Sequence, residues 1–143
     1  MHRLFVLVFV FACSGKVETV PAPPTDPAPS ASGIEAPASD RAEVAQATLD
    51  VAELQQYFHG RTPLRIVINR MVNPAWKLAH GGQAVGWVDE TSEDPRIEFT
   101  LLRVEGDKAG ATIRYEVEGV VMHAEFARVG GAWKLTKSDL AEE

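Results

Sequence analysis

The clearest pattern in the chain is a helical spacing of apolar residues between residues 40 and 58. The members of this stripe recur three and four positions apart: Val44, Ala47, Val51, Leu54 and Phe58. Such spacing predicts an amphipathic helix with one buried face. Asp40 supplies an N-cap, Gly60 a C-terminal stop, and Pro63 prevents further helix. A second capping signal at Asp50 leaves open a shorter helix that begins near Thr48.

After Pro63 the apolar pattern changes to a period of two, which is typical of half-buried β-strands. We expect strands at residues 64–72, 83–89, 96–105, 111–118 and 120–127, and a last strand with Trp133 and Leu135 on its inner side. Residues 106–110 and the pair Gly130-Gly131 predict hairpin turns. Gly119 is interpreted as a further hairpin, with a bulge in one long strand as the alternative. The predicted fold is therefore α+β, with one N-terminal helix packed on a curved antiparallel meander sheet of five to six strands.

The first twelve residues have the pattern of an export signal. A short basic head, Met1-His2-Arg3, precedes an uninterrupted apolar run from Leu4 to Ala12. As a helix this run would be roughly 15 Å long, about half the hydrocarbon thickness of a bilayer, so it is too short to span one. We predict a signal peptide at residues 1–12, followed at once by the only cysteine of the chain, Cys13.

Val10-Phe11-Ala12-Cys13 resembles the lipobox of bacterial lipoprotein precursors, which has an aliphatic residue three positions before the cysteine and a small residue directly before it. The bulky Phe11 and the short signal depart from that pattern. The resemblance implies cleavage behind Ala12 and lipidation of Cys13, and two or three acyl chains suffice for stable anchoring at about 0.8 kcal/mol per buried methylene. The alternatives are an ordinary secretory signal, with Cys13 incidental, and an unprocessed membrane-inserted segment.

A proline-rich stretch separates Cys13 from the helix. Six of the nine prolines fall between Val20 and Ala38, among Ala, Ser and Thr, so little apolar surface is available to offset the entropy of ordering. As polyproline II, residues 14–38 would reach roughly 75 Å at about 3.1 Å per residue. We therefore divide the chain into a signal peptide (1–12), a lipidated cysteine with a disordered linker (13–38), and a small α+β domain (39–143).

Charge changes the picture by excluding one class of partner. The chain has 14 Lys and Arg against 20 Asp and Glu, a net charge of −6, and its basic residues never form a dense run. Nucleic-acid binding needs a concentrated positive surface, so we expect no nucleic-acid partner. Arg61, Arg65 and Arg70 form a loose basic flank for which solvation is the simpler interpretation, and the acidic run at residues 89–94 is interpreted as a solvated turn.

Residues 110–135, which end in "ARVGGAWKL", resemble the closing strands of cystatin-like and nuclear-transport-factor-2-like α+β domains found on bacterial lipoproteins. The matching positions are Gly130, Gly131, Trp133 and Lys134. The nuclear-transport-factor-like members carry two or three helices before the sheet, whereas this chain has one predicted helix, so a cystatin-like cone fits better. The resemblance transfers no catalytic residue.

The sequence contains no motif that carries catalysis. His59 is expected to cap a helix end and His123 to face solvent, and no two histidines have a metal-ligand spacing. Nucleophile and phosphate-cradling motifs are absent, so we expect no metal, no cofactor and no catalytic residue. Trp76, Trp87 and His80 are the candidate contacts for a ligand or partner, although core packing is the simpler role for the tryptophans.

We therefore expect a lipid-anchored protein of the bacterial cell envelope, with a non-catalytic binding or interaction domain in the periplasm or at the cell surface. Its partners would be the membrane, through the lipid on Cys13, and an envelope protein or a small ligand. Ser14 is not the aspartate that retains many lipoproteins in the inner membrane, which favours the outer membrane. The alternatives are a small cone-shaped hydrolase or isomerase, which requires His80 or His123 beside an acidic residue in a pocket, and a domain that binds cell wall or polysaccharide, which requires Trp76 and Trp87 exposed side by side.

Overall fold

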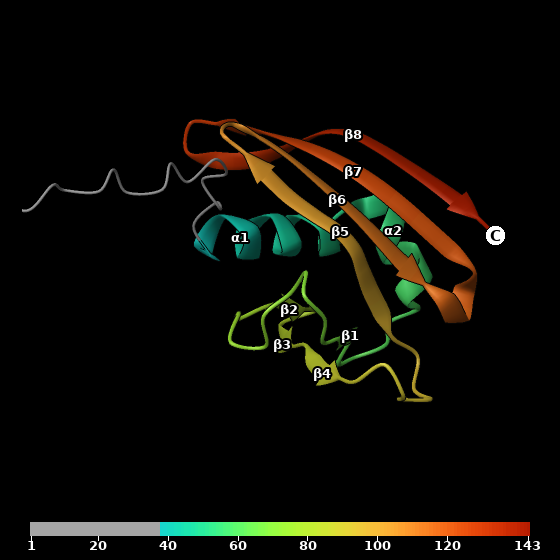
Figure 1. Cartoon of the computed structure of the whole chain (residues 1–143). Coiled ribbons are helices and arrows are strands. Elements are labelled where there is room, and N and C mark those ends of the chain that lie inside the picture. Colours follow the sequence, from blue (N-terminus) through green and yellow to red (C-terminus); the bar gives the residue numbers. More distant parts are fainter. Residues whose placement is uncertain (1–37) are drawn as a thin grey trace, which may run out of the picture. The chain divides into compact units, whose positions relative to one another are not determined.

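The computed structural model describes residues 38–143, which belong to one compact unit of the chain (Figure 1). The predicted signal peptide, Cys13 and almost all of the predicted linker lie outside the described residues. Within residues 38–143, no helix has the length and hydropathy required to cross a membrane.

The helical segment is interrupted where the sequence predicts one continuous helix. It consists of α1 (Ala38–Leu49), α2 (Ala52–Gln55) and the 3-10 helix η1 (Gln56–Phe58). Val51 separates α1 from α2 with an extended backbone, φ −63° and ψ 121°. The single long helix is therefore wrong, and the second capping signal at Asp50 marks the position of the break. His59 and Gly60 follow η1 with positive φ, which confirms the expected stop.

A six-stranded sheet follows, in the order β4-β1-β5-β6-β7-β8. Its strands are β1 (Arg65–Val67), β4 (Gly86–Val88), β5 (Ile97–Glu105), β6 (Lys108–Tyr115), β7 (Val120–Val129) and β8 (Ala132–Glu142). Strands β5 to β8 pair antiparallel as consecutive neighbours, whereas β1 pairs in parallel with both β4 and β5. The α+β class is confirmed, but the antiparallel meander is limited to β5–β8, so the expectation that the whole sheet is a meander is wrong.

The predicted strand at residues 64–72 ends early, at Val67, and a long connection leads from it to β4. The Asn69 side chain turns the chain after β1: its Nδ2 donates to the carbonyl of Phe99 at 3.0 Å, and its Oδ1 accepts from the amide of Met71 at 2.8 Å. The chain then makes a separate small hairpin, β2 (Ala79–His80) with β3 (Gln83–Ala84), before β4 returns beside β1. Such an excursion is what a parallel pair of strands needs.

The turns within β5–β8 follow the predicted glycines. The first turn is shorter than predicted, because Glu105 already pairs with Lys108 across Gly106-Asp107. Between β6 and β7, the 3-10 turn η2 (Glu116–Glu118) and Gly119 connect the paired residues Tyr115 and Val120, which confirms the hairpin. The last strand extends further than its apolar pattern indicates, to Glu142.

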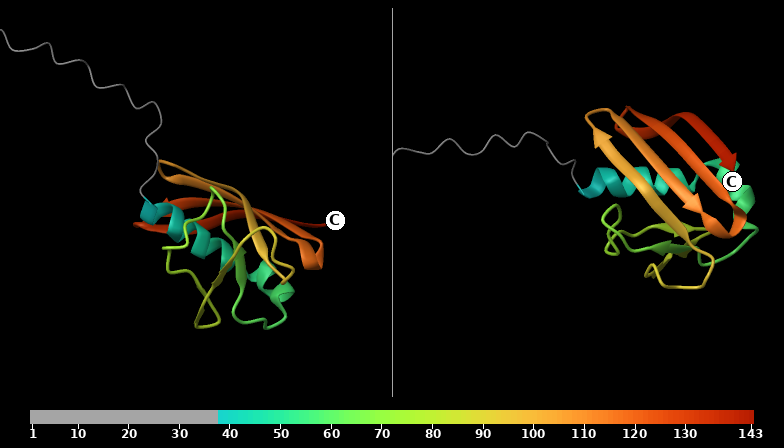
Figure 2. Two further views of the ribbon diagram at one scale, coloured as in Figure 1. Left: turned by 60° about the horizontal axis from the view of Figure 1, so that its bottom comes forward. Right: turned by 45° about the vertical axis from the view of Figure 1, so that its right-hand side comes forward.

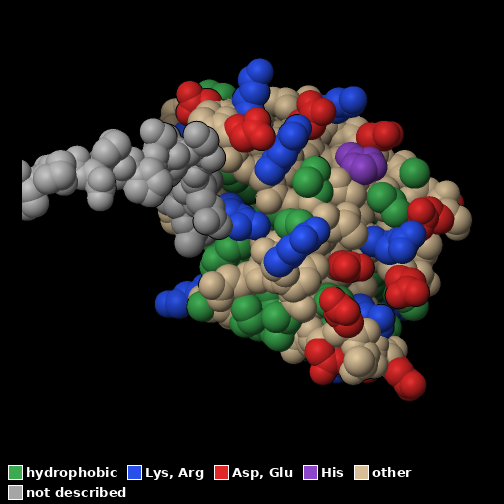
Figure 3. Space-filling model, in the orientation of Figure 1, with side chains coloured by type: hydrophobic (Ala, Val, Ile, Leu, Met, Phe, Trp, Pro, Cys, Tyr) green, Lys and Arg blue, Asp and Glu red, His purple; other side chains and the backbone are tan. Residues whose placement is uncertain are grey.

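The helical segment covers one face of β5–β8 (Figures 1 and 2). The fully buried side chains of the interface lie on alternate positions of β5, β6 and β7 and on the helical segment: Ile97, Phe99, Ile113, Tyr115, Met122, Leu49, Leu54 and Phe58. Trp133 is buried as expected, whereas Leu135, also expected inside, is 45% exposed on the edge strand. The opposite sheet face is wet, and Figure 3 shows acidic and basic side chains interspersed over it.

Polar contacts fix the two ends of the helical segment to opposite ends of the sheet. At the start of α1, Asp40 Oδ1 pairs with Arg128 Nη2 at 2.5 Å near the end of β7, where the Arg128 guanidinium stacks 4.5 Å from the Trp133 ring centroid. At the other end, the Tyr57 hydroxyl in η1 donates to Glu142 at 2.8 Å near the end of β8. The helical segment therefore runs from the β7–β8 turn to the β6–β7 turn.

Candidate functional site

The candidate site is a pocket of about 240 Å³ where β1 and β5 begin and β6 ends. We call it the arginine pocket and define it by its lining residues: Arg61, Thr62, Pro63, Leu64, Arg65, Asp94, Pro95, Ile97 and Tyr115. Its wall combines two guanidinium groups and one phenol with apolar side chains. This combination is typical of small-ligand sites, where a few polar groups orient a ligand against apolar surface.

One guanidinium nitrogen organises the polar side of the pocket. Arg61 Nη1 donates to the hydroxyl of Tyr115 at 2.6 Å and to Glu118 Oε1 at 2.9 Å. His59 Nε2 lies 3.2 Å from the other carboxylate oxygen of Glu118. The phenol of Tyr115 is 1% exposed, so Arg61 meets a hydroxyl at the edge of the hydrophobic core.

These contacts shift the pKa values of two of the groups. The hydrogen bond to the Tyr115 hydroxyl is the main reason that the pKa of Arg61 is raised, so Arg61 stays protonated. Burial alone would raise the pKa of Glu118. Hydrogen bonds from His59 and Arg61 outweigh that effect and hold the pKa below its ordinary value of 4.5.

Aromatic packing holds this arrangement against the core. The fully buried ring of Phe58 makes edge-to-face contacts with His80, at a centroid distance of 4.9 Å, and with Tyr115, at 5.9 Å. The amide of Arg61 donates to the carbonyl of Phe58 at 2.8 Å, so the turn through His59 is tied to the buried ring. Within this turn, His59 adopts the left-handed backbone conformation, with φ 48°.

Arg65, the second guanidinium of the arginine pocket, forms an ion pair through Nη1 with Asp94. Both side chains are substantially exposed, 39% for Arg65 and 54% for Asp94. Surface ion pairs of this kind are weak and exchange readily with solvent or ligand groups. The guanidinium of Arg65 is therefore accessible from the pocket.

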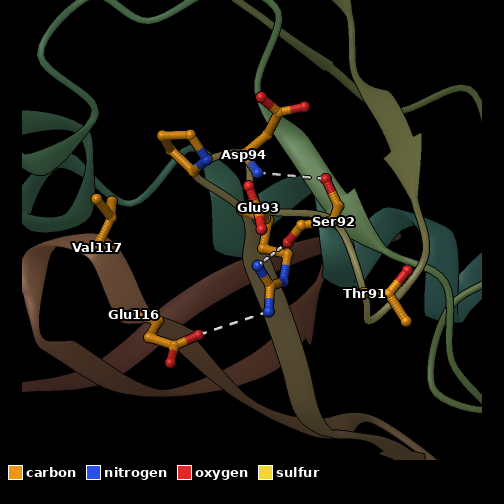
Figure 4. Close-up of a pocket in the computed structure, with 8 residues that line it drawn as sticks. Thr91, Ser92, Glu93, Asp94, Glu116 and Val117 are labelled. Atoms are coloured by element: carbon orange, nitrogen blue, oxygen red, sulfur yellow. Dashed lines mark hydrogen bonds and ion pairs between the residues drawn. The ribbon is translucent and has the colours of Figure 1, made fainter.

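A second hollow, of about 370 Å³, adjoins the arginine pocket and shares Asp94 and Pro95 with it (Figure 4). Arg96 holds its rim together: its guanidinium donates to the carbonyls of Ser92 and Glu90, the latter at 3.2 Å, and lies 3.7 Å from Glu116 Oε2. The rim is the acidic run at residues 89–94, which forms the exposed turn that the sequence predicts.

The start of that turn is stabilised by Asp89. Its Oδ1 accepts hydrogen bonds from the Thr91 hydroxyl at 2.6 Å and from the Thr91 amide at 2.9 Å. The hydroxyl bond is the main reason that the pKa of Asp89 is lowered. The carboxylate therefore acts as a turn-stabilising group of the kind common for Asx residues.

The three residues that the sequence suggests as contacts do not line the arginine pocket. Trp76, in the segment between β1 and β2, and Trp87, on edge strand β4, are both partly buried and pack against the hydrophobic core. His80 is also partly buried, and its ring contacts the ring of Phe58. A role for these three residues in binding stays a prediction.

The remaining histidines have different surroundings. His59 was expected to cap a helix through the dipole, but it follows a short 3-10 helix and instead faces Glu118. His123 is exposed on the wet sheet face, as expected, and its Nδ1 lies 2.8 Å from Thr112 Oγ1. Within residues 38–143, no group of three or more His, Cys, Asp or Glu side chains is placed to hold a metal ion.

Sequence reasoning missed Tyr115 as a site residue because its position in the period-two pattern indicates only a core residue. The basic flank offered a partial signal, since Arg61 and Arg65 line the pocket. Arg70 of that flank is exposed and lies outside the lining. Comparison with family models, with curated proteins and with solved structures found no match.

Proposed function

We propose that this chain is a lipid-anchored protein of the bacterial cell envelope, and that its folded domain binds a ligand or partner at the arginine pocket without catalysing a reaction. The anchor part of the proposal rests on the lipobox-like sequence before Cys13 and on the proline-rich stretch behind it. The binding part rests on the pocket and on its distance from the start of α1.

The observation that carries the proposal is the distance between the linker attachment and the pocket. The described chain begins with α1, which the Asp40–Arg128 ion pair fixes near the β7–β8 turn. The arginine pocket lies at the other end of the sheet, where Arg61 meets Tyr115 and Glu118. Strand β7 has ten residues and connects these ends, a length of roughly 30 Å at about 3.3 Å per residue. The pocket therefore lies at the end of the sheet remote from the start of α1, which supports a role in binding away from the point where the described chain begins.

The chemistry of the pocket supports binding. Exposed guanidinium groups next to apolar side chains provide both orientation and apolar contact for a ligand. Trp76 and Trp87, by contrast, pack against the core, so a polysaccharide site of paired exposed tryptophans has less support.

A hydrolase or isomerase is the second candidate, because one hollow of about 270 Å³ on the wet sheet face is lined by His123, Glu125, Lys137 and Asp139. The hydrogen-bond partner of His123 is the Thr112 hydroxyl and not a carboxylate. A general base usually needs a partner that orients its ring, so this hollow is the weaker candidate. Hydrolytic activity that His123→Ala abolishes would favour it over the binding role.

Two experiments test the proposal. In the first, cells are fed labelled palmitate: the wild-type chain and a Ser14→Ala control should incorporate label, and Cys13→Ala should not. Unlabelled wild-type protein, or mature protein free in the medium without Cys13, would refute the anchor.

In the second experiment, amide NMR spectra of the ¹⁵N-labelled full chain in detergent are recorded with and without envelope extract. Resonances of Arg61, Thr62 and Tyr115 should shift, while those of the wet sheet face, such as His123, should not. Shifts confined to the wet sheet face, or no shifts, would refute the binding role of the arginine pocket.

A further inference from the structure

The arginine pocket contains more hydrogen-bond donors than acceptors. Arg61 uses Nη1 for both of its hydrogen bonds, and its other guanidinium donors have no acceptor among residues 38–143. The Tyr115 hydroxyl accepts from Arg61, and its own proton has no acceptor within the same described part of the chain. The Arg61 side chain is 40% exposed, so a ligand that displaces solvent from these donors must bring acceptor oxygens.

The planar geometry of the guanidinium donors favours a carboxylate over other acceptor groups. A guanidinium presents a rigid fork of N–H groups that matches two oxygens in one plane. Arg61, Arg65 and Tyr115 all line the pocket, so a carboxylate bound there has two guanidinium groups and one hydroxyl in the surrounding wall as donors. Its two oxygens provide about four acceptor positions.

Charge balance favours a singly charged anion over a doubly charged one. Arg61 is paired with Glu118 and Arg65 with Asp94, so two positive and two negative groups already face each other at this site. A doubly charged phosphate would meet more repulsion from the two carboxylates than a single carboxylate does. Asp94 can also accept a hydrogen bond from an ammonium or amide group next to the bound carboxylate.

Size and wall chemistry limit the rest of the ligand. The pocket volume of about 240 Å³ lies below the usual range for drug-sized ligands. Pro63, Leu64, Pro95 and Ile97 form its apolar wall. This space suits a carboxylate that carries one or two small apolar groups.

We infer that the arginine pocket binds a terminal carboxylate attached to a small apolar residue, from a free amino acid or from the C-terminus of a peptide. The inference rests on the proposed binding role of this pocket and adds the chemical class of its ligand. Arg61 and Arg65 hold the carboxylate, the Tyr115 hydroxyl donates to it, and the apolar wall contacts the adjoining side chain.

The test titrates the full chain in detergent with four probes, followed by the amide resonances of Arg61, Thr62 and Tyr115. The probes are acetyl-Ala-Ala with a free carboxylate, the same peptide as its C-terminal amide, L-alanine, and inorganic phosphate. Acetyl-Ala-Ala should shift these resonances to saturation, and the amide should not. Because each substitution removes hydrogen bonds to a charged group, Arg65→Gln and Tyr115→Phe should each weaken binding by roughly ten- to hundredfold.

Arg103→Gln is the matched control, because Arg103 is an exposed arginine on β5 that lies outside the arginine pocket and near Glu105. It should leave the dissociation constant unchanged. Unaltered resonances of the other strands in each variant establish that the fold is intact. Tyr115→Phe keeps the buried ring and so tests the hydroxyl without a cavity.

The outcomes separate the sources of the carboxylate. Binding of L-alanine as tightly as acetyl-Ala-Ala supports a free amino acid, and binding of the peptide alone supports a peptide C-terminus. Equal binding of acid and amide, displacement of the peptide by phosphate at equal or lower concentration, or no shift with any carboxylate would overturn the inference. If envelope extract shifts the pocket resonances while no carboxylate does, only the ligand class is wrong; if extract shifts nothing there, the proposed binding role is wrong as well.

Discussion

Replacement of Phe58 by alanine tests whether the core and the arginine pocket form one packed unit. Phe58 is fully buried, and its ring lies edge-to-face against both His80 and Tyr115. Removal of a buried Phe side chain costs about 3–5 kcal/mol through lost transfer free energy and the cavity that remains. Two aromatic contacts, each worth roughly 0.5–1.5 kcal/mol beyond burial, place Phe58→Ala in the upper half of that range.

That loss is a large fraction of the about 5–15 kcal/mol by which an ordinary small domain is stable. Urea unfolding followed by tryptophan fluorescence measures it, since Trp76, Trp87 and Trp133 all lie in the described domain. Leu135→Ala is the control: Leu135 is 45% exposed, so its loss should change the free energy of unfolding by no more than about 0.5 kcal/mol. A cost for Phe58→Ala as small as that of the control would refute the packing described here.

Two further predictions concern Glu118 and the β6–β7 turn. The folded-state pKa of Glu118 is depressed, so its contribution to stability is present above pH 4.5 and is lost as the pH falls through the folded pKa. Urea midpoints measured above and below pH 4.5 should therefore show that Glu118→Gln loses less stability on acidification than the wild-type chain. An identical loss in both proteins would contradict the ion pairing. Gly119→Ala should lower the melting temperature more than Gly106→Ala. Both glycines have positive φ, 61° and 58°, a conformation that costs a residue with a Cβ roughly 1–2 kcal/mol. At Gly119 the added Cβ would also lie 3.1 Å from the main-chain oxygen of Glu143, whereas at Gly106 it would meet no atom within 4 Å. Equal melting temperatures for the two variants would contradict the close approach.

The antiparallel part of the fold could be predicted from the sequence because its signals are local. The alternation through Ala111, Ile113 and Tyr115 assigns inward positions correctly, and glycines mark the turns between neighbouring strands. Hairpin pairing joins strands that are adjacent along the chain, so the pattern and the turn together determine the pairing.

The parallel part could not be predicted because its decisive contacts are remote in the sequence. Strand β1 has three residues, and its end is set by Asn69, whose amide reaches the carbonyl of Phe99 on β5. The helix break at Val51 was indicated only by the capping signal at Asp50, because the apolar stripe continues into α2 and η1 and its periodicity stays regular across the break.

The candidate site could be predicted only in part for the same physical reason. Arg61 follows η1 and Tyr115 ends β6, and only packing of the helical segment on the sheet brings them within 2.6 Å. No local pattern pairs two residues so far apart. The sequence indicated a basic flank but gave no indication that a buried phenol lies beside it.

Photo-crosslinking in intact cells tests the central claim, a tethered domain that binds at the arginine pocket, most directly. A photo-reactive residue replaces Thr62, whose exposed side chain lines the pocket, or Lys134, which is exposed on β8 near the attachment end. The account predicts a mass adduct or crosslinked partner at position 62, its loss when Arg65→Gln is added, and no adduct at position 134. Equal adducts at both positions, or an adduct at position 62 that persists with Arg65→Gln, would contradict it.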